Sequence, residues 1–203
     1  MGYSQAQKAE SRQRVLESAS RQIREHGIEA LGVAECMRSA GLTHGAFYGH
    51  FASRDALIVE ALEYALSQSE ERMAARAIDA GKRADTPLQS IAEAFLDERH
   101  LKNPGTGCAL CALAGEARHA SADIRALLTR YLRELTALVA QAASNGDEKL
   151  ALGIVATIVG AITLARAVDD EDLARSILAS SLALVMTQDG EGTQGRRVLK
   201  DPA

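Results

Sequence analysis

The apolar positions of this 203-residue chain recur with a helical period almost throughout. No segment shows the alternation of period two that a half-buried strand requires. The pattern therefore predicts an all-α protein of about nine helices. These are expected over residues 11–26, 33–40, 43–50, 53–80, 87–103, 108–119, 124–144, 148–168 and 171–186.

Breaks in this pattern divide the chain into three parts. Residues 1–52 hold three helices and are expected to form one domain, and residues 53–187 are expected to form a larger helical bundle. Residues 188–203 are polar and are expected to be a disordered tail. The segment 150–167 is apolar on nearly every side, so it needs cover all round. Together with the helix after it, this segment predicts a two-helix face that pairs with its own copy in a C2 homodimer.

Composition places the chain among globular proteins. Hydrophobic residues make up 47% and charged residues 25%, and the net charge is −4. Three cysteines are too few and odd in number for a disulfide-stapled secreted domain. The start of the chain is polar and lacks an apolar signal core, and the longest apolar run, Leu150–Ala165, is shorter than a membrane span of about 20 residues. We therefore expect a cytoplasmic protein with no membrane segment.

Charge is unevenly distributed along the chain. Residues 1–54 carry seven basic and five acidic side chains, a net charge of +2, whereas the remainder has a net charge of −6. Three of the five histidines, His26, His44 and His50, also lie in this first segment. A basic end on an acidic body is typical of a protein with one module that faces nucleic acid.

Two short helices about a glycine turn in this segment predict a helix-turn-helix. Its second helix, expected from Thr43 to His50, would enter the DNA major groove. Thr43 can cap that helix with its hydroxyl, and Gly45 allows a close approach to the DNA backbone. Tyr48 and His50 can donate to phosphates, and Arg54 can pair with a phosphate at the start of the next helix.

The string Gly-Leu-Thr-His-Gly-Ala-Phe-Tyr-Gly-His-Phe-Ala-Ser-Arg over 41–54 resembles the signature of the tetracycline-repressor (TetR) family. This resemblance implies a transcriptional regulator, acting most often as a repressor, that binds double-stranded operator DNA as a homodimer. By the same resemblance, the phosphate contacts are Thr43, Tyr48, His50 and Arg54, and the residues nearest the bases are His44, Gly45 and Ala46. Ala46 and Gly49 offer no side-chain hydrogen bond, so DNA shape and water would carry more of the recognition.

The family resemblance also implies a small-molecule effector enclosed by the helices between Arg54 and Ser144. Helical-wheel positions predict a mostly aliphatic pocket for a small apolar ligand, with Tyr131 or Arg99 as its polar contact. The candidate ligand-binding residues are Leu66, Phe95, Arg99, Cys111, Leu127 and Tyr131. Binding of the ligand would lower operator affinity and relieve repression.

Cys108 and Cys111 support two alternatives to control by a ligand. Three positions apart on a helix, they share one face, and the first hypothesis is a thiol-switched regulator. The second is a zinc site, which needs two further ligands and has only His100 or His119 nearby. The interpretation that we favour is that both cysteines are small apolar core residues.

Two carboxylate–histidine pairs, Asp97 with His100 and Glu116 with His119, have the spacing found in di-iron helical bundles. Such a site also needs inward-facing glutamates from two other helices, and the remaining helices are apolar inside. We interpret both pairs as solvated surface groups. No phosphate-binding loop or nucleophile motif is present, so we expect neither catalytic residues nor a cofactor or metal.

Overall fold

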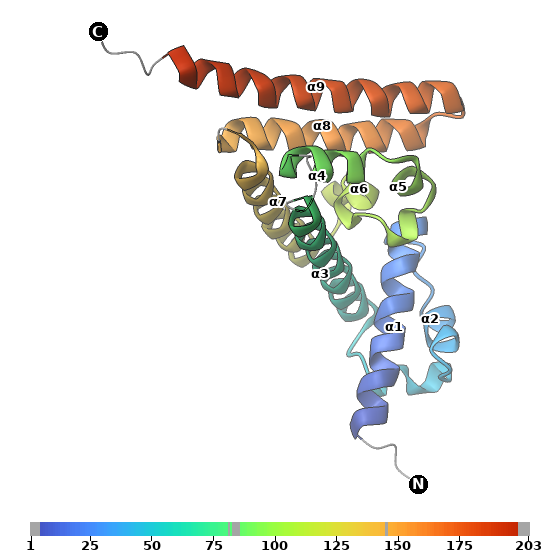
Figure 1. Ribbon diagram of the computed structural model, residues 1–203. Helices are drawn as coiled ribbons and strands as arrows, with labels where there is room; N and C mark the ends of the chain where they lie inside the picture. Colours follow the sequence, from blue (N-terminus) through green and yellow to red (C-terminus); the bar gives the residue numbers. More distant parts are fainter. Residues whose placement is uncertain (1–4, 81, 83–85, 145, 199–203) are drawn as a thin grey trace. The chain divides into compact units, whose positions relative to one another are not determined.

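The computed structural model describes residues 5–80, 82, 86–144 and 146–198. Within these ranges the chain forms nine α-helices and three short 3-10 helices, with no strand, which confirms the all-α prediction (Figure 1). The elements are α1 (Gln5–His26), α2 (Val33–Ser39), η1 (His44–Gly49), α3 (Arg54–Ala80), α4 (Pro87–Phe95), α5 (Glu98–Lys102), η2 (Pro104–Thr106), α6 (Ala109–Leu113), η3 (Ala117–His119), α7 (Ala122–Ala142), α8 (Glu148–Ala167) and α9 (Glu171–Val198).

Three of the expected helices differ from the prediction in type or continuity. The third is a 3-10 helix, and the one expected over 108–119 is divided into α6 and η3. The helix after Pro87 is broken into α4 and α5, because the Asp97 side chain accepts a hydrogen bond from the Arg99 amide at 2.6 Å and starts a new helix. This cap is an Asx-type contact that competes with continuation of the helix.

The last helix is longer than the sequence pattern indicated. It was expected to end at Met186 and to be followed by a disordered tail, yet α9 continues to Val198. No proline interrupts the chain between residues 105 and 201, so no backbone amide is lost and no ring clash ends the helix. The rest of the expected tail, 199–203, lies outside the described residues.

The chain divides into two compact units. Unit 1 consists of Met1–Ser69 and Pro104–Thr129, and unit 2 of Glu70–Asn103 and Arg130–Ala203. In unit 1, α1 packs against α2, η2 and α6, and α2 packs against η1. Side chains with no exposed surface form its core, among them Val15, Ala19, Ile23, Met37 and Leu57.

The boundaries of these two units differ from the domain boundary that the sequence predicts after residue 52. The reason is that α1 contacts η2 and α6, which come from the middle of the sequence, as well as its neighbour α2. Unit 1 therefore contains the predicted helix-turn-helix together with the start of α3 and the segment 104–129.

Unit 2 is organised around α8. This helix packs along α9, and α4 and α5 also contact it (Figure 1). One stripe of α8 is buried, formed by Ala151, Ile154, Val155, Ile158, Ala161, Ile162 and Ala165. The guanidinium of Arg166 near its end donates to the His100 carbonyl at 2.8 Å and ties α8 to α5. The other side of α8 remains apolar but exposed, with Leu152 and Leu164 about half exposed.

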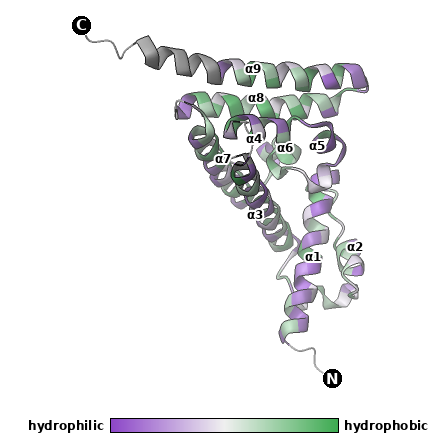
Figure 2. Ribbon diagram, viewed as in Figure 1, coloured by the Kyte–Doolittle hydropathy of each residue, from purple (hydrophilic) through white to green (hydrophobic). Residues whose placement is uncertain are grey.

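By length and composition alone, α8 would satisfy the requirements of a membrane span. Figure 2 shows that hydrophobic residues dominate much of its length. One such helix is weak evidence for a membrane span, and in this structure α9, α4 and α5 pack against it.

The cap at the start of α9 offers a direct test of this part of the fold. The Asp170 carboxylate accepts from the amides of Asp172 and Leu173 at 2.9 and 3.0 Å, whereas Asp169 is an exposed neighbour without a capping position. We expect Asp170→Ala to lower the free energy of unfolding by about 1 kcal/mol. Asp169→Ala removes the same charge and is expected to change it by less than about 0.5 kcal/mol. Urea denaturation of both variants measures the difference, and equal losses would contradict the cap.

Candidate functional site

Gly41 forms the turn between α2 and η1. Its φ of +74° lies in the left-handed region that favours glycine. The Leu42 amide beyond it donates to the Met37 carbonyl at 2.9 Å, so one of the last carbonyls of α2 is satisfied as the chain reverses. The predicted glycine turn is therefore present with its expected geometry.

The second helix of the pair, η1, is tighter than expected. Its hydrogen bonds are of the i→i+3 type, as between the Ala46 amide and the Thr43 carbonyl at 3.0 Å. The predicted cap by the Thr43 hydroxyl is wrong, because that side chain makes no capping hydrogen bond. Thr43 is exposed, so its hydroxyl faces solvent.

Two phenylalanines hold η1 against the rest of unit 1. Phe47 is 3% exposed, and its ring stacks on that of Phe51 with centroids 5.8 Å apart. The ring of Tyr48 meets Phe47 edge-on at 5.2 Å but is 78% exposed. Phe47 is thus a core residue, as the sequence analysis favoured, whereas Tyr48 extends its phenol into solvent.

The residues predicted to contact DNA differ in their exposure to solvent. Thr43, His44, Gly45 and Tyr48 are exposed, and Ala46, His50 and Arg54 are partly buried. The exposed members belong to η1 or to the residue just before it, so one short element carries most of the candidate interface.

Arg54 has a structural role that the sequence analysis did not foresee. Its guanidinium Nη2 donates to the carbonyls of Ile28 and Glu29 at 3.0 and 2.9 Å, and its Nε donates to that of Leu31 at 3.4 Å. These bonds fasten the start of α3 to the loop between α1 and α2. A contact of Arg54 with phosphate stays a prediction.

Arg12 of α1 contacts the connection between η1 and α3. Its guanidinium lies 4.7 Å from the centre of the Phe51 ring, donates to the His50 carbonyl at 3.4 Å and pairs with Glu60 of α3. A cation held against an aromatic ring and a carboxylate fixes the connection between η1 and α3. The sequence offered no signal for this residue, because its partners lie far along the chain.

The pKa of His50 lies below the ordinary value for histidine. Burial is the largest cause, and the charges of Lys8 and Arg12 act in the same direction. His50 is therefore neutral at pH 7, and its buried Nδ1 has no hydrogen-bond partner within the described part of the chain. A neutral imidazole can donate one hydrogen bond to a phosphate but adds no positive charge.

Within unit 1, the segment 104–119 makes hydrogen bonds with the end of α1. The Ile28 amide donates to the Glu116 carboxylate at 3.0 Å, and the buried Arg24 guanidinium donates to the Gly107 carbonyl at 3.4 Å. Gly105 faces the Glu25 side chain so closely that an added Cβ would collide with it. These contacts connect the helix that supports η1 to the segment that carries Cys108.

All three cysteines are buried thiols that form no disulfide. Burial raises the pKa of Cys36 to about 11, which leaves it protonated at neutral pH. Cys108 directly precedes α6 and Cys111 lies within that helix, where both fill a core position beside Leu110 and Leu113.

The residues of the metal hypotheses have other roles here. His100 Nδ1 lies 2.8 Å from the Phe95 carbonyl, and the Asp97 carboxylate is bound to Arg99. Glu116 accepts from the Ile28 amide, as described above. In the ranges that the structure covers, no group of three or more potential ligands comes together around a possible metal position.

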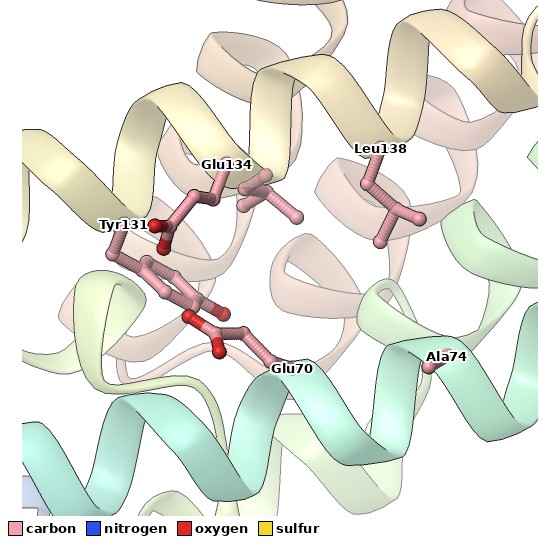
Figure 3. Close-up of a pocket in the computed structure, with 6 residues that line it drawn as sticks. Glu70, Ala74, Tyr131, Glu134 and Leu138 are labelled. Carbon is pink, nitrogen blue, oxygen red and sulfur yellow. The ribbon is translucent and has the colours of Figure 1, made fainter.

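A pocket of about 180 Å³ lies between α3 and α7 in unit 2 (Figure 3). Tyr131, one of the predicted effector contacts, lines it and is 1% exposed. The sequence analysis missed its other lining residues, which are Glu70, Ala74, Glu134, Leu135 and Leu138. The spacing of 131, 134, 135 and 138 on α7 was a visible signal, but nothing in the sequence pointed to the facing residues of α3.

The other predicted effector residues lie elsewhere. Phe95 is buried in α4, where its ring lies 5.5 Å from that of His100. The Arg99 side chain is 87% exposed and bonded to Asp97, so it does not line the pocket. The remaining three, Leu66, Cys111 and Leu127, belong to unit 1.

Comparison with known proteins places this site in context. Residues 15–61 match a family model described as bacterial regulatory proteins, tetR family. The HTH-type transcriptional repressor NemR of Escherichia coli (strain K12) is 23% identical over 139 residues, which are 68% of this chain and 70% of NemR. YerO of Bacillus subtilis (strain 168), an uncharacterized HTH-type transcriptional regulator, is 33% identical over 64 residues. That match spans 32% of this chain but only 22% of YerO.

Solved structures extend the similarity to most of the chain. The reduced form of E. coli NemR superposes with a TM-score of 0.68 at 22% identity and covers 86% of this chain and 95% of its own. A TetR transcriptional regulator from Chloroflexus aurantiacus J-10-FL gives a TM-score of 0.71 at 22% identity over 90% and 95%. At these identities the similarity establishes a shared fold.

Replacing Arg54 by methionine tests its structural role. The variant keeps an unbranched apolar stem but removes the donors to Ile28, Glu29 and Leu31, so we expect the free energy of unfolding to fall by about 2 kcal/mol. Arg38→Met, at an exposed position on α2, is the matched control and is expected to change it by less than about 0.5 kcal/mol. Urea unfolding without DNA separates the two, and a stable Arg54→Met protein would leave the residue free for a purely DNA-binding role.

Proposed function

We propose that the chain is a member of the tetR family of bacterial regulatory proteins, and that it is a repressor whose affinity for operator DNA is lowered by a small ligand. The observation that carries the proposal is the geometry of η1. Phe47 anchors the helix from below, while His44 and Tyr48 are exposed above it. Because its target is chromosomal DNA, the protein would act in the cytoplasm.

We propose that the residues of η1 and its flanks make two kinds of contact with DNA, some with phosphates and others with bases. The hydroxyls of Thr43 and Tyr48 and the imidazole of His50 suit phosphate oxygens, which fix orientation without reading sequence. His44, Gly45 and Ala46 would approach the bases. Since two of these three have no polar side chain, we propose that local DNA shape contributes much of the specificity.

We propose that the repressor is a homodimer joined through α8 and α9. These two helices pack on each other and leave leucines exposed on their outer sides: Leu152, Leu164, Leu173 and Leu184. Exposed leucines recurring along two adjacent helices are typical of a self-complementary interface. Dimerisation would present two η1 helices to the half-sites of a palindrome about 34–36 Å apart.

The effector contacts of the proposal are Tyr131 and the other residues that line its pocket. Ligand contacts by Leu66, Phe95, Arg99, Cys111 and Leu127, none of which lines that pocket, stay sequence-based predictions. A ligand weakens operator binding only by the difference between its affinities for the two conformations of the repressor. A coupling of about 1–3 kcal/mol, or 5- to 150-fold in operator affinity, is typical of such regulation. The hydrogen bonds that Glu116 and Arg24 make at the end of α1 are a suitable place for coupling between ligand binding and operator binding. They hold the helix that supports η1.

Selection of DNA from a random library by the purified protein tests the repressor proposal. We expect a palindromic sequence to be enriched and its affinity to fall steeply with salt, because phosphate contacts release counterions. Tyr48→Phe is expected to weaken binding about fivefold on every enriched sequence, since it removes one hydroxyl from an exposed ring. Tyr64→Phe, whose hydroxyl bonds Gln68 and Glu17 within unit 1, is the control and keeps wild-type affinity. Absence of any enriched sequence would refute operator binding.

A thiol-switched regulator is the second candidate function. Cys108 and Cys111 lie next to η2, and η2 and α6 both contact α1. Oxidation adds polar bulk to a buried thiol, which a packed core tolerates poorly. Cys36 is an unsuitable sensor, since its pKa of about 11 keeps it protonated.

Hydrogen peroxide distinguishes the two candidates. If a ligand controls the protein, oxidation changes operator affinity less than about twofold. If thiols control it, peroxide weakens operator binding in the wild type and in Cys36→Ala but not in Cys108→Ser. Fluorescence anisotropy with labelled operator DNA, repeated after reduction with dithiothreitol, provides the readout, and a reversible loss confined to proteins with Cys108 would replace our proposal by the thiol switch.

A further inference from the structure

The basic side chains of residues 1–54 differ in how far they are already engaged within the chain. Four of the seven make hydrogen bonds or ion pairs, and these are Arg12, Arg14, Arg24 and Arg54. The other three are exposed and have no such partner among the described residues, and these are Lys8, Arg21 and Arg38. Only a cation of the second group can add a new ionic contact without first breaking an old one.

Lys8 lies on the face of α1 that contacts the end of η1. It comes four residues before Arg12, so the two side chains lie on one side of the helix. Arg12 donates to the His50 carbonyl at 3.4 Å, and Lys8 is one turn, about 6 Å, nearer the start of α1. Figure 1 shows this part of α1 beside the segment between α2 and α3. The first turn of α1 has no acidic side chain, and Glu10 in the next turn pairs with Arg14.

The ammonium of Lys8 also acts on His50 through its charge. Burial is the largest cause of the lowered pKa of His50, and the charges of Lys8 and Arg12 lower it further. Since salt screens exposed charges beyond about 10 Å, this effect is that of a near neighbour. Arg21, by contrast, lies about 20 Å further along α1, where its side chain lies against Gly105. Of the three exposed cations, Lys8 is therefore the one whose charge reaches His50.

Phosphate binding at this position needs a charge that the nearby donors lack. The Tyr48 hydroxyl and the neutral His50 imidazole can orient a phosphate, but neither carries the positive charge that releases a counterion from DNA. The guanidinium of Arg12 is engaged by Glu60, which offsets its charge. An exposed lysine carries a hydrated point charge on a flexible stem and can reach a phosphate without being buried.

We propose that Lys8 binds a DNA phosphate at or next to the one that Tyr48 and His50 contact, so that the first turns of α1 belong to the DNA interface. The contact is an ion pair with a phosphodiester oxygen and reads no base. This assignment adds a DNA-contacting residue to the proposed function and rests on it. Its partner is the backbone of double-stranded DNA, in the operator and in other sequences alike.

The dependence of DNA affinity on salt tests the contact in the full-length protein. Fluorescence anisotropy with the DNA enriched from the random library is repeated over a series of salt concentrations. We expect Lys8→Gln to weaken binding about fivefold at low salt and to reduce the slope of log affinity against log salt by about 0.9 for each bound subunit. Lys8→Arg keeps the charge and is expected to retain the wild-type slope.

Arg21→Gln is the matched control, because it removes the same charge from an exposed position on the same helix. It is expected to leave the slope unchanged and to alter affinity less than about twofold. All titrations are made at about pH 8, because loss of the Lys8 charge raises the pKa of His50 toward its ordinary value of 6.5 and would otherwise add a charge there. Lys8 has no partner within the described ranges, so its replacement leaves the melting temperature unchanged.

Neutral methylphosphonates, placed one at a time in the DNA, locate the phosphate. The methylphosphonate at the position that Lys8 contacts weakens binding by the wild type but not by Lys8→Gln, and this loss of additivity marks a direct pair. His50→Gln locates the phosphate of His50 in the same way. We expect the two positions to coincide or to be neighbours on one strand.

A wild-type salt slope in Lys8→Gln would overturn the proposal, as would an equal loss in Arg21→Gln or coupling to a phosphate remote from that of His50. These results leave the proposed function intact as long as a palindrome is enriched. If no sequence is enriched, operator binding fails, and the same salt series on duplex DNA of mixed sequence still tests Lys8. A lowered slope there supports the phosphate contact, whereas an unchanged slope, or no salt-dependent binding at all, contradicts it.

Discussion

A 3-10 helix of six residues has too few internal hydrogen bonds to persist in water, so η1 depends on the burial of Phe47 beneath it. Phe47 stacks on Phe51, and Arg12 covers the Phe51 ring in turn. The orientation of Tyr48, whose ring meets that of Phe47 edge-on, follows from this packing. The candidate DNA-binding surface is thus defined by aromatic contacts below it rather than by the helix itself.

Several basic side chains near the start of the chain make hydrogen bonds or ion pairs within unit 1. Residues 1–54 contain seven basic side chains, but Arg12 pairs with Glu60, Arg24 bonds the Gly107 carbonyl and Arg54 bonds carbonyls of the α1–α2 loop. These cations stabilise unit 1, and their donors are already engaged there. Direct hydrogen bonds to DNA phosphates therefore have fewer cationic donors available than composition indicates, which increases the relative importance of neutral donors such as Tyr48 and His50.

Local patterns in the sequence are sufficient to predict part of this structure. The all-α fold, the turn at Gly41 and the burial of Phe47 follow from helical period and from glycine's access to positive φ, which are properties of neighbouring residues. The 3-10 form of η1 and the break at Asp97 were not predictable with equal certainty, because the energy differences between such short helices are small. The length of α9 was missed because its composition, rich in glycine and polar residues, resembles that of a disordered segment.

The contacts that sequence analysis missed share a different property, namely a large separation along the chain. Arg54 bonds carbonyls about 25 residues earlier, and Glu70 meets Glu134 across two helices. Periodicity identifies which face of a helix is buried but not which helix lies opposite. Tyr131 was therefore found as an inward-facing residue of α7, whereas its acidic neighbour on α3 was not.

One helix links the two kinds of site. α3 begins with Arg54, which fastens the loop between α1 and α2, and carries Glu70 and Ala74, which line the pocket. A ligand that changes how α3 lies against α7 acts on an element whose first residue supports the helix-turn-helix. The required energy is modest, because a net contribution of about 1 kcal/mol from each of two hydrogen bonds already falls within the range of allosteric coupling. The bonds of Arg54, and those of Glu116 and Arg24 on α1, are numerous enough for this, so the proposed control by a ligand would not require any large rearrangement of the core.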